Sequence, residues 1–260
     1  MKRILPILLS AILLLSACSS QKTAPEKTPV LQQNSQTQAV PKPEQSTEEA
    51  PAPAEPGAVQ ETDWLAVYAP VFDSYEILFT VVDAYKQGGE ASVDLTNQDY
   101  DLASNLSLYL ESMAKPGYCL IDLDANGVPE LIVGLMTDDA FFSRIIASLF
   151  TVENGAPKLV FTSYTRSRYC LSSDGGFIYA GSGGAAYSDY YACSLSGSEL
   201  TRAYGVYSDG DRGFFYCENG DRESAAKTES ITQEQFSEWF NKLDGLIIDP
   251  PAYTMMDFVP

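Results

Sequence analysis

Six turn-forming dipeptides divide the second half of this 260-residue chain into short segments rich in Ile, Val, Phe and Tyr. Asn-Gly and Asp-Gly tolerate positive φ and suit the tight turns that match the twist of paired strands. Their spacing predicts an antiparallel β-meander of about seven to nine strands, beginning at Tyr118. The dipeptides are Asn126-Gly127, Asn154-Gly155, Asp174-Gly175, Gly197-Ser198, Asp209-Gly210 and Asn219-Gly220.

Apolar residues at helical spacing flank the predicted meander on both sides. Trp64–Gln87 and Asn97–Ala114 precede it, and Pro70 is expected to divide or kink the first of these helices. After the meander, Thr232 and Gln235 form a capping-box sequence ahead of further helical spacing. We therefore predict an α+β fold with N-terminal helices, an antiparallel meander and a C-terminal helix that packs on the sheet.

The composition changes sharply at residue 63. Residues 19–62 contain seven prolines and no aromatic residue, and Gln, Ser, Thr, Glu and Ala fill most of the rest. Such a segment buries too little apolar area to offset the entropy of ordering it. We predict a disordered tether over 18–62 and a folded domain over 63–260, which is long enough to enclose its own core.

The first residues have the three-part pattern of an export signal: a basic start, an apolar run from Ile4 to Leu15, and small residues up to Cys18. A membrane-spanning helix needs about 20 apolar residues, and this run is shorter. Leu15-Ser16-Ala17-Cys18 resembles the lipobox of bacterial lipoproteins. The resemblance implies a signal peptide over 1–17, diacylation of Cys18, and lipid anchoring on the extracytoplasmic face of the cell membrane. An ordinary secretory signal with a chance cysteine is the alternative.

Charge and composition exclude several classes of function. The chain carries 16 Lys plus Arg against 35 Asp plus Glu, and its formal net charge of −19 argues against nucleic acid as a partner. It contains no histidine, which excludes Ser-His-Asp and Cys-His catalytic pairs and His-ligated zinc. P-loop, dinucleotide-binding and GxSxG signatures are also absent from the sequence.

One segment between two predicted strands carries a series of oxygen ligands. Gly127 lets the backbone turn back sharply, so that side chains at alternate positions converge. Hard oxygen ligands with three formal negative charges suit Ca²⁺ better than Mg²⁺, which demands a tighter octahedron. We predict a structural calcium site; the alternative is a metal-free hairpin whose Asp and Asn side chains bond their own backbone. The ligands at positions 1, 3, 5, 7 and 9 are Asp122, Asp124, Asn126, the carbonyl of Val128, and Glu130.

This loop resembles the EF-hand calcium loop, except that position 12 is Val133 instead of a bidentate Glu and that its flanks read as strands. It is closer to the hairpin calcium loops of integrin-type FG-GAP repeats, which place ligands at positions 1, 3, 5, 7 and 9. A single copy does not imply the propeller fold of those proteins. With its lipobox, tether and the segments Ser167–Tyr169 and Gly181–Tyr187, the chain resembles a broad group of functionally uncharacterised surface lipoproteins of Gram-positive bacteria.

Tyrosines and arginines form a second candidate region. Nine of the 16 tyrosines lie between Tyr164 and Tyr216, where they either present a surface to a sugar or a protein or pack on both faces of the sheet. The arginines either pair with acidic neighbours or hold a ligand carboxylate. The candidate ligand-binding residues are Arg166, Arg168, Tyr187 and Tyr190.

The remaining cysteines permit two disulfides in an exported chain, but each stands among apolar or aromatic neighbours in a predicted strand. Buried free thiols are therefore favoured. These cysteines are Cys119, Cys170, Cys193 and Cys217.

These features favour a membrane-anchored, non-enzymatic binding or accessory module of the cell envelope, with an envelope glycan or a protein as its partner. The alternative is a secreted hydrolase that uses two carboxylates, possibly on glycans. That activity requires a cleft with two Asp or Glu about 5–10 Å apart, away from the calcium loop.

Overall fold

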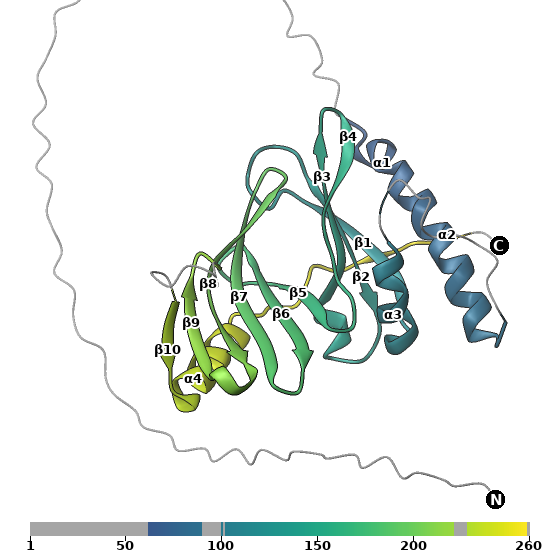
Figure 1. Ribbon diagram of the computed structural model, residues 1–260. Coiled ribbons are helices and arrows are strands. Elements are labelled where there is room, and N and C mark those ends of the chain that lie inside the picture. Colours follow the sequence, from purple (N-terminus) through teal and green to yellow (C-terminus); the bar gives the residue numbers. More distant parts are fainter. Residues whose placement is uncertain (1–61, 90–99, 101, 221–227, 259–260) are drawn as a thin grey trace, which may run out of the picture. The chain divides into compact units, whose positions relative to one another are not determined.

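The computed structural model describes residues 62–89, 100, 102–220 and 228–258, and the structural statements below refer to these residues (Figure 1). The predicted signal peptide, Cys18 and the tether up to residue 61 lie outside them. In the described part of the chain, no helix combines the length and the apolar character needed to span a membrane. Helices, a large antiparallel sheet and a final helix follow one another along the chain, which confirms the predicted α+β fold.

Helices precede the sheet, as predicted. Pro70 lies in the first turn of the second helix, where its missing N–H costs no helical hydrogen bond, and Tyr68 separates this helix from the first. This confirms the expected division near Pro70. The helices are α1 (Trp64–Val67), α2 (Ala69–Lys86) and α3 (Ala103–Ser112).

The sheet starts three residues earlier than the predicted Tyr118. Met113 follows α3 with a left-handed backbone (φ 53°), which ends the helix and leads the chain into a strand at Lys115. Pro116 and Gly117 therefore lie inside the first strand, although such residues usually mark a turn. Pro116 is tolerated there because β1 lies near the edge of the sheet, where its neighbour opposite β2 is only a two-residue strand.

All strand pairs are antiparallel, and they join into one 11-stranded sheet. Ten strands follow the order β10-β9-β8-β7-β6-β5-β3-β2-β1-β11, and β4 pairs with β3 beside this path. The prediction of seven to nine strands was low because short strands at both edges depend on tertiary pairing. The strands are β1 (Lys115–Ile121), β2 (Glu130–Met136), β3 (Ile145–Glu153), β4 (Ala156–Thr162), β5 (Ser167–Leu171), β6 (Phe177–Gly184), β7 (Tyr187–Ser196), β8 (Glu199–Asp209), β9 (Phe214–Glu218), β10 (Thr228–Ile231) and β11 (Thr254–Met255).

Strand β3 is a branch point in the sheet. One side of β3 pairs with β2, while on the other side its first residues pair with β5 and its later residues pair with β4. The β3–β4 hairpin turns at Asn154-Gly155, and both residues have positive φ (54° and 79°). This confirms the turn predicted from that dipeptide.

The helices cover one face of the sheet, which we call the outer face (Figure 1). Leu131, Val133 and Phe150 pack against α1–α3 on this face, and Val206 packs against the C-terminal helix α4 (Gln233–Asp244). Cys170 belongs to the first of these cores and pairs with Ile178 of the second, so both cores lie on the same face.

The opposite, inner face carries a third core that extends from β1 to β9. Ile121 and Leu123 at one end of the sheet pack in the same cluster as Leu195 and Leu200 of the β7–β8 hairpin. The sheet must therefore curl, because otherwise strands so far apart in its order could not share a core. This curl brings the β1–β2 loop close to the β7–β8 turn.

Helix α4 forms as the sequence predicts. Thr232 and Gln235 make a complete capping box, and the helix packs on β7, β8 and β9. Phe240 meets Tyr190 edge-on at 4.4 Å between ring centres. After α4 the chain returns to β1, where Met256 is buried in the core beneath α1–α3.

Candidate functional site

The predicted calcium loop connects β1 to β2, and Asp and Asn side chains within it accept hydrogen bonds from backbone N–H groups of the same loop. Asp122 Oδ1 accepts a hydrogen bond from the Asn126 N–H at 3.1 Å, and its Oδ2 accepts from the Gly127 N–H at 2.9 Å. Asp124 Oδ1 also accepts from Asn126 (3.2 Å), and Asn126 Oδ1 accepts from the Val128 N–H (2.7 Å). These bonds fold the loop back over Asp122, and Gly127 permits the turn with a φ of 85°.

Glu130 closes the loop from the inside of the protein. It is fully buried at the start of β2, paired with Ile121 across the hairpin. Its Oε2 accepts from the Leu123 N–H at 2.8 Å and its Oε1 from Thr151 Oγ1 at 3.1 Å. Burial raises the pKa of the Glu130 carboxyl, and the nearby charge of Asp124 raises it further.

Two contacts from distant parts of the chain hold the loop in place. The Tyr68 hydroxyl, between α1 and α2, donates to the Pro129 carbonyl at 2.8 Å. Asp124 Oδ2 accepts from the Gly197 N–H in the β7–β8 turn at 2.6 Å. Tyr68, Thr151 and Gly197 were not predicted as part of this site, because their sequence positions carry no sign of where the fold places them.

Three carboxyl groups converge in this loop. One oxygen atom each from Asp122, Asp124 and Glu130 lie within 4.8 Å of one another, close enough to hold a metal ion. Asp122 is exposed, Asp124 is half-buried and Glu130 is buried, so the group extends from the surface into the protein. Val133, the residue at position 12 of the loop pattern, is buried in the core beneath the helices and supplies no ligand.

The same geometry agrees with both interpretations of the sequence. The backbone bonds to Asp122, Asp124 and Asn126 are those of a metal-free Asx hairpin. A carboxylate oxygen that accepts one hydrogen bond keeps a second lone pair, so these bonds leave room for a cation. The structure thus establishes a group of three acidic residues whose spacing could hold a metal ion.

The candidate ligand-binding arginines and tyrosines do not all lie together in the structure. Arg166, Arg168 and Tyr190 line one pocket of about 350 Å³ over β5–β7. Tyr187 does not line this pocket; it lies at the start of β7, half exposed, with its hydroxyl against Gly210. Most other tyrosines of the region serve packing, since Tyr179 and Tyr191 are buried in the inner core.

The cysteines within the described residues are free thiols, as favoured from their neighbours. Cys193 and Cys217 are buried, while Cys119 and Cys170 are half-buried. Burial raises the pKa of Cys119 to about 11 and that of Cys170 and Cys193 to about 12. These thiols therefore stay protonated and unreactive at neutral pH.

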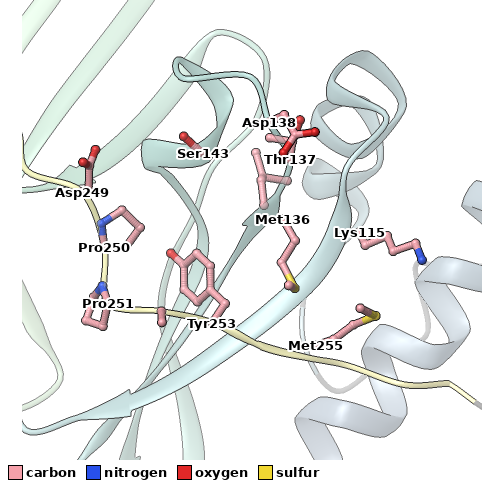
Figure 2. Close-up of a pocket in the computed structure, with 12 residues that line it drawn as sticks. Lys115, Met136, Thr137, Asp138, Ser143, Asp249, Pro250, Pro251, Tyr253 and Met255 are labelled. Atoms are coloured by element: carbon pink, nitrogen blue, oxygen red, sulfur yellow. The ribbon is translucent and has the colours of Figure 1, made fainter.

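A larger pocket of about 550 Å³ lies where the C-terminal segment crosses β2 (Figure 2). Figure 2 shows Asp249 on the C-terminal segment and Asp138 on the chain that follows β2. Asp249 is bound to Arg144, with 2.8 Å between its Oδ1 and the arginine Nε. The Tyr253 ring packs so closely on Gly134 that a side chain there would collide with it.

Comparisons with protein-family models, with curated proteins and with solved structures found no match to this chain.

Proposed function

We propose that this protein is a lipid-anchored, extracytoplasmic binding or accessory module whose β1–β2 loop holds a structural Ca²⁺ ion. The observation that carries the calcium part is the convergence of the Asp122, Asp124 and Glu130 carboxyl groups within 4.8 Å. The lipobox sequence ending at Cys18 and the proline-rich segment after it support the anchor and the tether.

Charge balance favours a cation at this loop. Glu130 is fully buried and forms no ion pair with a basic side chain within the described residues, so its ionised form is disfavoured and Asp124 adds repulsion. A divalent ion would stabilise all three carboxylates at once. Hard oxygen ligands suit Ca²⁺, and Asn126 and the Val128 carbonyl are proposed to complete its shell.

The role we propose for the ion is structural. Asp124 links the loop to Gly197 of the β7–β8 turn, so a metal ion there would secure the curl of the sheet. Glu130 is buried and hydrogen-bonded to Leu123 and Thr151, which suits a ligand that anchors an ion within the fold.

Thermal unfolding of the full chain in EDTA, in Ca²⁺ and in Mg²⁺ tests the calcium site. We expect Ca²⁺ to raise the melting temperature and EDTA to reverse the effect, with Mg²⁺ weaker. A ligand at about 100 times its Kd stabilises a fold by about 2.7 kcal/mol. The Asp122→Asn variant is expected to lose this response.

The matched control is Asp174→Asn, which removes an exposed carboxylate in a different turn. It should keep the full response to Ca²⁺. If Ca²⁺ leaves the wild-type melting temperature unchanged, or shifts that of Asp122→Asn equally, the calcium proposal is wrong.

The anchor is tested separately by metabolic labelling with a fatty acid in the native host. The wild-type chain is expected to incorporate label and to fractionate with membranes. Cys18→Ser is expected to do neither, and labelling of Cys18→Ser at the wild-type level would contradict acylation at that residue.

A carboxylate-dependent hydrolase is the second candidate, because Asp138 and Asp249 line the same pocket (Figure 2). The ion pair between Asp249 and Arg144 gives one of these carboxylates a structural partner, which makes this candidate the weaker one. Glycan hydrolysis by the wild-type chain that is lost in both Asp138→Asn and Asp249→Asn would establish it.

A further inference from the structure

The pocket over β5–β7, which we call the arginine pocket, is built by the register of three strands. Arg168 of β5 pairs with Ala180 of β6, and Ala180 pairs with Tyr190 of β7. The three side chains therefore lie side by side on the outer face of the sheet. The small Ala180 between two long side chains leaves the hollow, whose volume is about 350 Å³.

The next row of the same face extends the pocket. Arg166 is two residues before Arg168 and Ser182 two residues after Ala180, and both line the hollow. The Ser182 N–H donates to the Arg166 carbonyl at 2.9 Å, which joins β6 to the residue just before β5. Arg166, Arg168, Ser182 and Tyr190 thus line one cavity.

Arg168 is held in place but lacks a hydrogen-bond acceptor. Its guanidinium carbon lies 4.8 Å from the centre of the Phe141 ring, a stacking contact that orients the group. Its Nε is buried without a hydrogen-bond partner among the described residues. Buried donors almost always have a partner, so this nitrogen is a place where a ligand acceptor is missing.

The two arginines of the pocket keep their charge available. The chain has a net charge of −19, and Arg144, Lys158 and Arg212 each form an ion pair with a carboxylate. Neither Arg166 nor Arg168 takes part in an ion pair within the described residues. The pocket thus brings together two basic side chains without an ion-pair partner in a chain of strongly negative net charge.

We propose that the arginine pocket binds the carboxylate of an acidic sugar. A guanidinium fork matches the two oxygens of a carboxylate, and the contact with Phe141 limits the orientations that the Arg168 group can take. The hydroxyls of Ser182 and Tyr190 suit sugar hydroxyls, and the volume falls in the range of about 300–1,000 Å³ typical of small-molecule sites. This inference gives a ligand class to the binding role proposed above and does not depend on the calcium loop.

Titration of the full chain with glucuronate, followed by calorimetry or by NMR shifts, tests the proposal. EDTA is kept in the buffer so that failure of the calcium site does not affect the result. We expect saturable binding of glucuronate, with glucose at least about 10-fold weaker because it lacks the carboxylate. Inorganic phosphate and acetate are also expected to bind more weakly, because they offer no sugar hydroxyls.

Variants assign the binding to this pocket. Arg166 is exposed in the wild-type structure. Arg166→Gln should therefore keep the wild-type melting temperature while weakening the binding of glucuronate about 10-fold. Arg168→Gln should weaken it at least as much, and Arg168→Lys should recover only part of the affinity because the fork is lost. Arg212→Gln, which removes an exposed arginine elsewhere, is the control and should bind like the wild type.

Three results would overturn the proposal: glucuronate fails to bind saturably, phosphate or acetate binds as tightly as glucuronate, or Arg166→Gln and Arg212→Gln have equal effects. A loss of the calcium response with glucuronate binding intact would count against the calcium site alone.

Discussion

At the scale of single residues, Asn105 shows how polar groups are used inside this fold. Its side chain is fully buried and all four of its hydrogen-bonding positions are occupied. The amide nitrogen donates to the carbonyls of Ala147 (2.9 Å) and Ser163 (2.8 Å), and the amide oxygen accepts from Tyr75 (2.8 Å) and Ser148 (2.9 Å). Asn105 thereby fastens α3 to α2 and to β3.

Replacing Asn105 with Leu is expected to destabilise the fold by about 3 kcal/mol or more. The change leaves buried carbonyls and hydroxyls without partners, and each such group costs about 1–3 kcal/mol. Urea unfolding measures the difference. The exposed Asn241→Leu in α4 is the control, with an expected effect of about 0.5 kcal/mol or less. Equal effects of the two changes would show that the network contributes little.

Burial of the thiols predicts that the stability of the fold depends on pH in the alkaline range. A thiol such as Cys193 ionises near 9.0 in the unfolded chain but near 12 in the fold. The folded state therefore holds the proton that the unfolded state releases, and stability must fall as the pH rises from about 9 toward about 12. Below about 9 this contribution is fully present.

Urea midpoints measured across that pH range test the effect of Cys193. Cys193→Ala should reduce the alkaline loss of stability, while Ser194→Ala, its exposed neighbour, should not. Tyrosine and lysine titrations are common to both variants and cancel. An identical alkaline slope in both would contradict the assigned thiol pKa.

At the scale of elements, some helices, strands and turns are determined by local sequence and others by tertiary contacts. Helix α4 was predictable because its start depends on residues three apart: Thr232 accepts from the Gln235 N–H, and Gln235 accepts from the Thr232 N–H. The β3–β4 turn was predictable for the same reason, since Asn154 and Gly155 adopt their own preferred φ. By contrast, β11 forms only because Met255 reaches Gly117 from the far end of the chain.

Removing the cap of α4 should weaken that helix. Thr232→Ala leaves the Gln235 N–H without its acceptor and is expected to cost about 1 kcal/mol of stability. Ser237→Ala is the matched control, because that hydroxyl donates only to the Gln233 carbonyl within the helix. Chemical unfolding distinguishes the two, and a larger effect of Ser237→Ala would contradict the capping argument.

At the scale of the whole molecule, the curl of the sheet joins distant segments at one end. Ser198 in the β7–β8 turn donates to Glu153 of β3 at 2.9 Å, beside the Lys158–Glu153 ion pair. The Asp124–Gly197 bond lies in the same region and spans 73 residues of sequence. An ion in the β1–β2 loop would therefore act on two hairpins at once.

Hydrogen exchange tests this coupling directly. If Ca²⁺ binds as proposed, it should slow exchange at Gly197 as well as within residues 122–130, because Asp124 contacts both. Amides of β9 and β10, at the other edge of the sheet, should change little. Protection confined to residues 122–130 would mean that the ion does not secure the curl.

The sequence alone determined the class of fold, the Asn154-Gly155 turn, the cap of α4 and the series of acidic residues from Asp122 to Glu130, since each depends on residues close together along the chain. Only the tertiary structure decided that the sheet curls, that Thr151 and Gly197 bond to the acidic loop, and that Arg166, Arg168 and Tyr190 share one pocket while Tyr187 lies apart. The physical reason is register: strand pairing and burial place these side chains, and neither follows from local sequence preference.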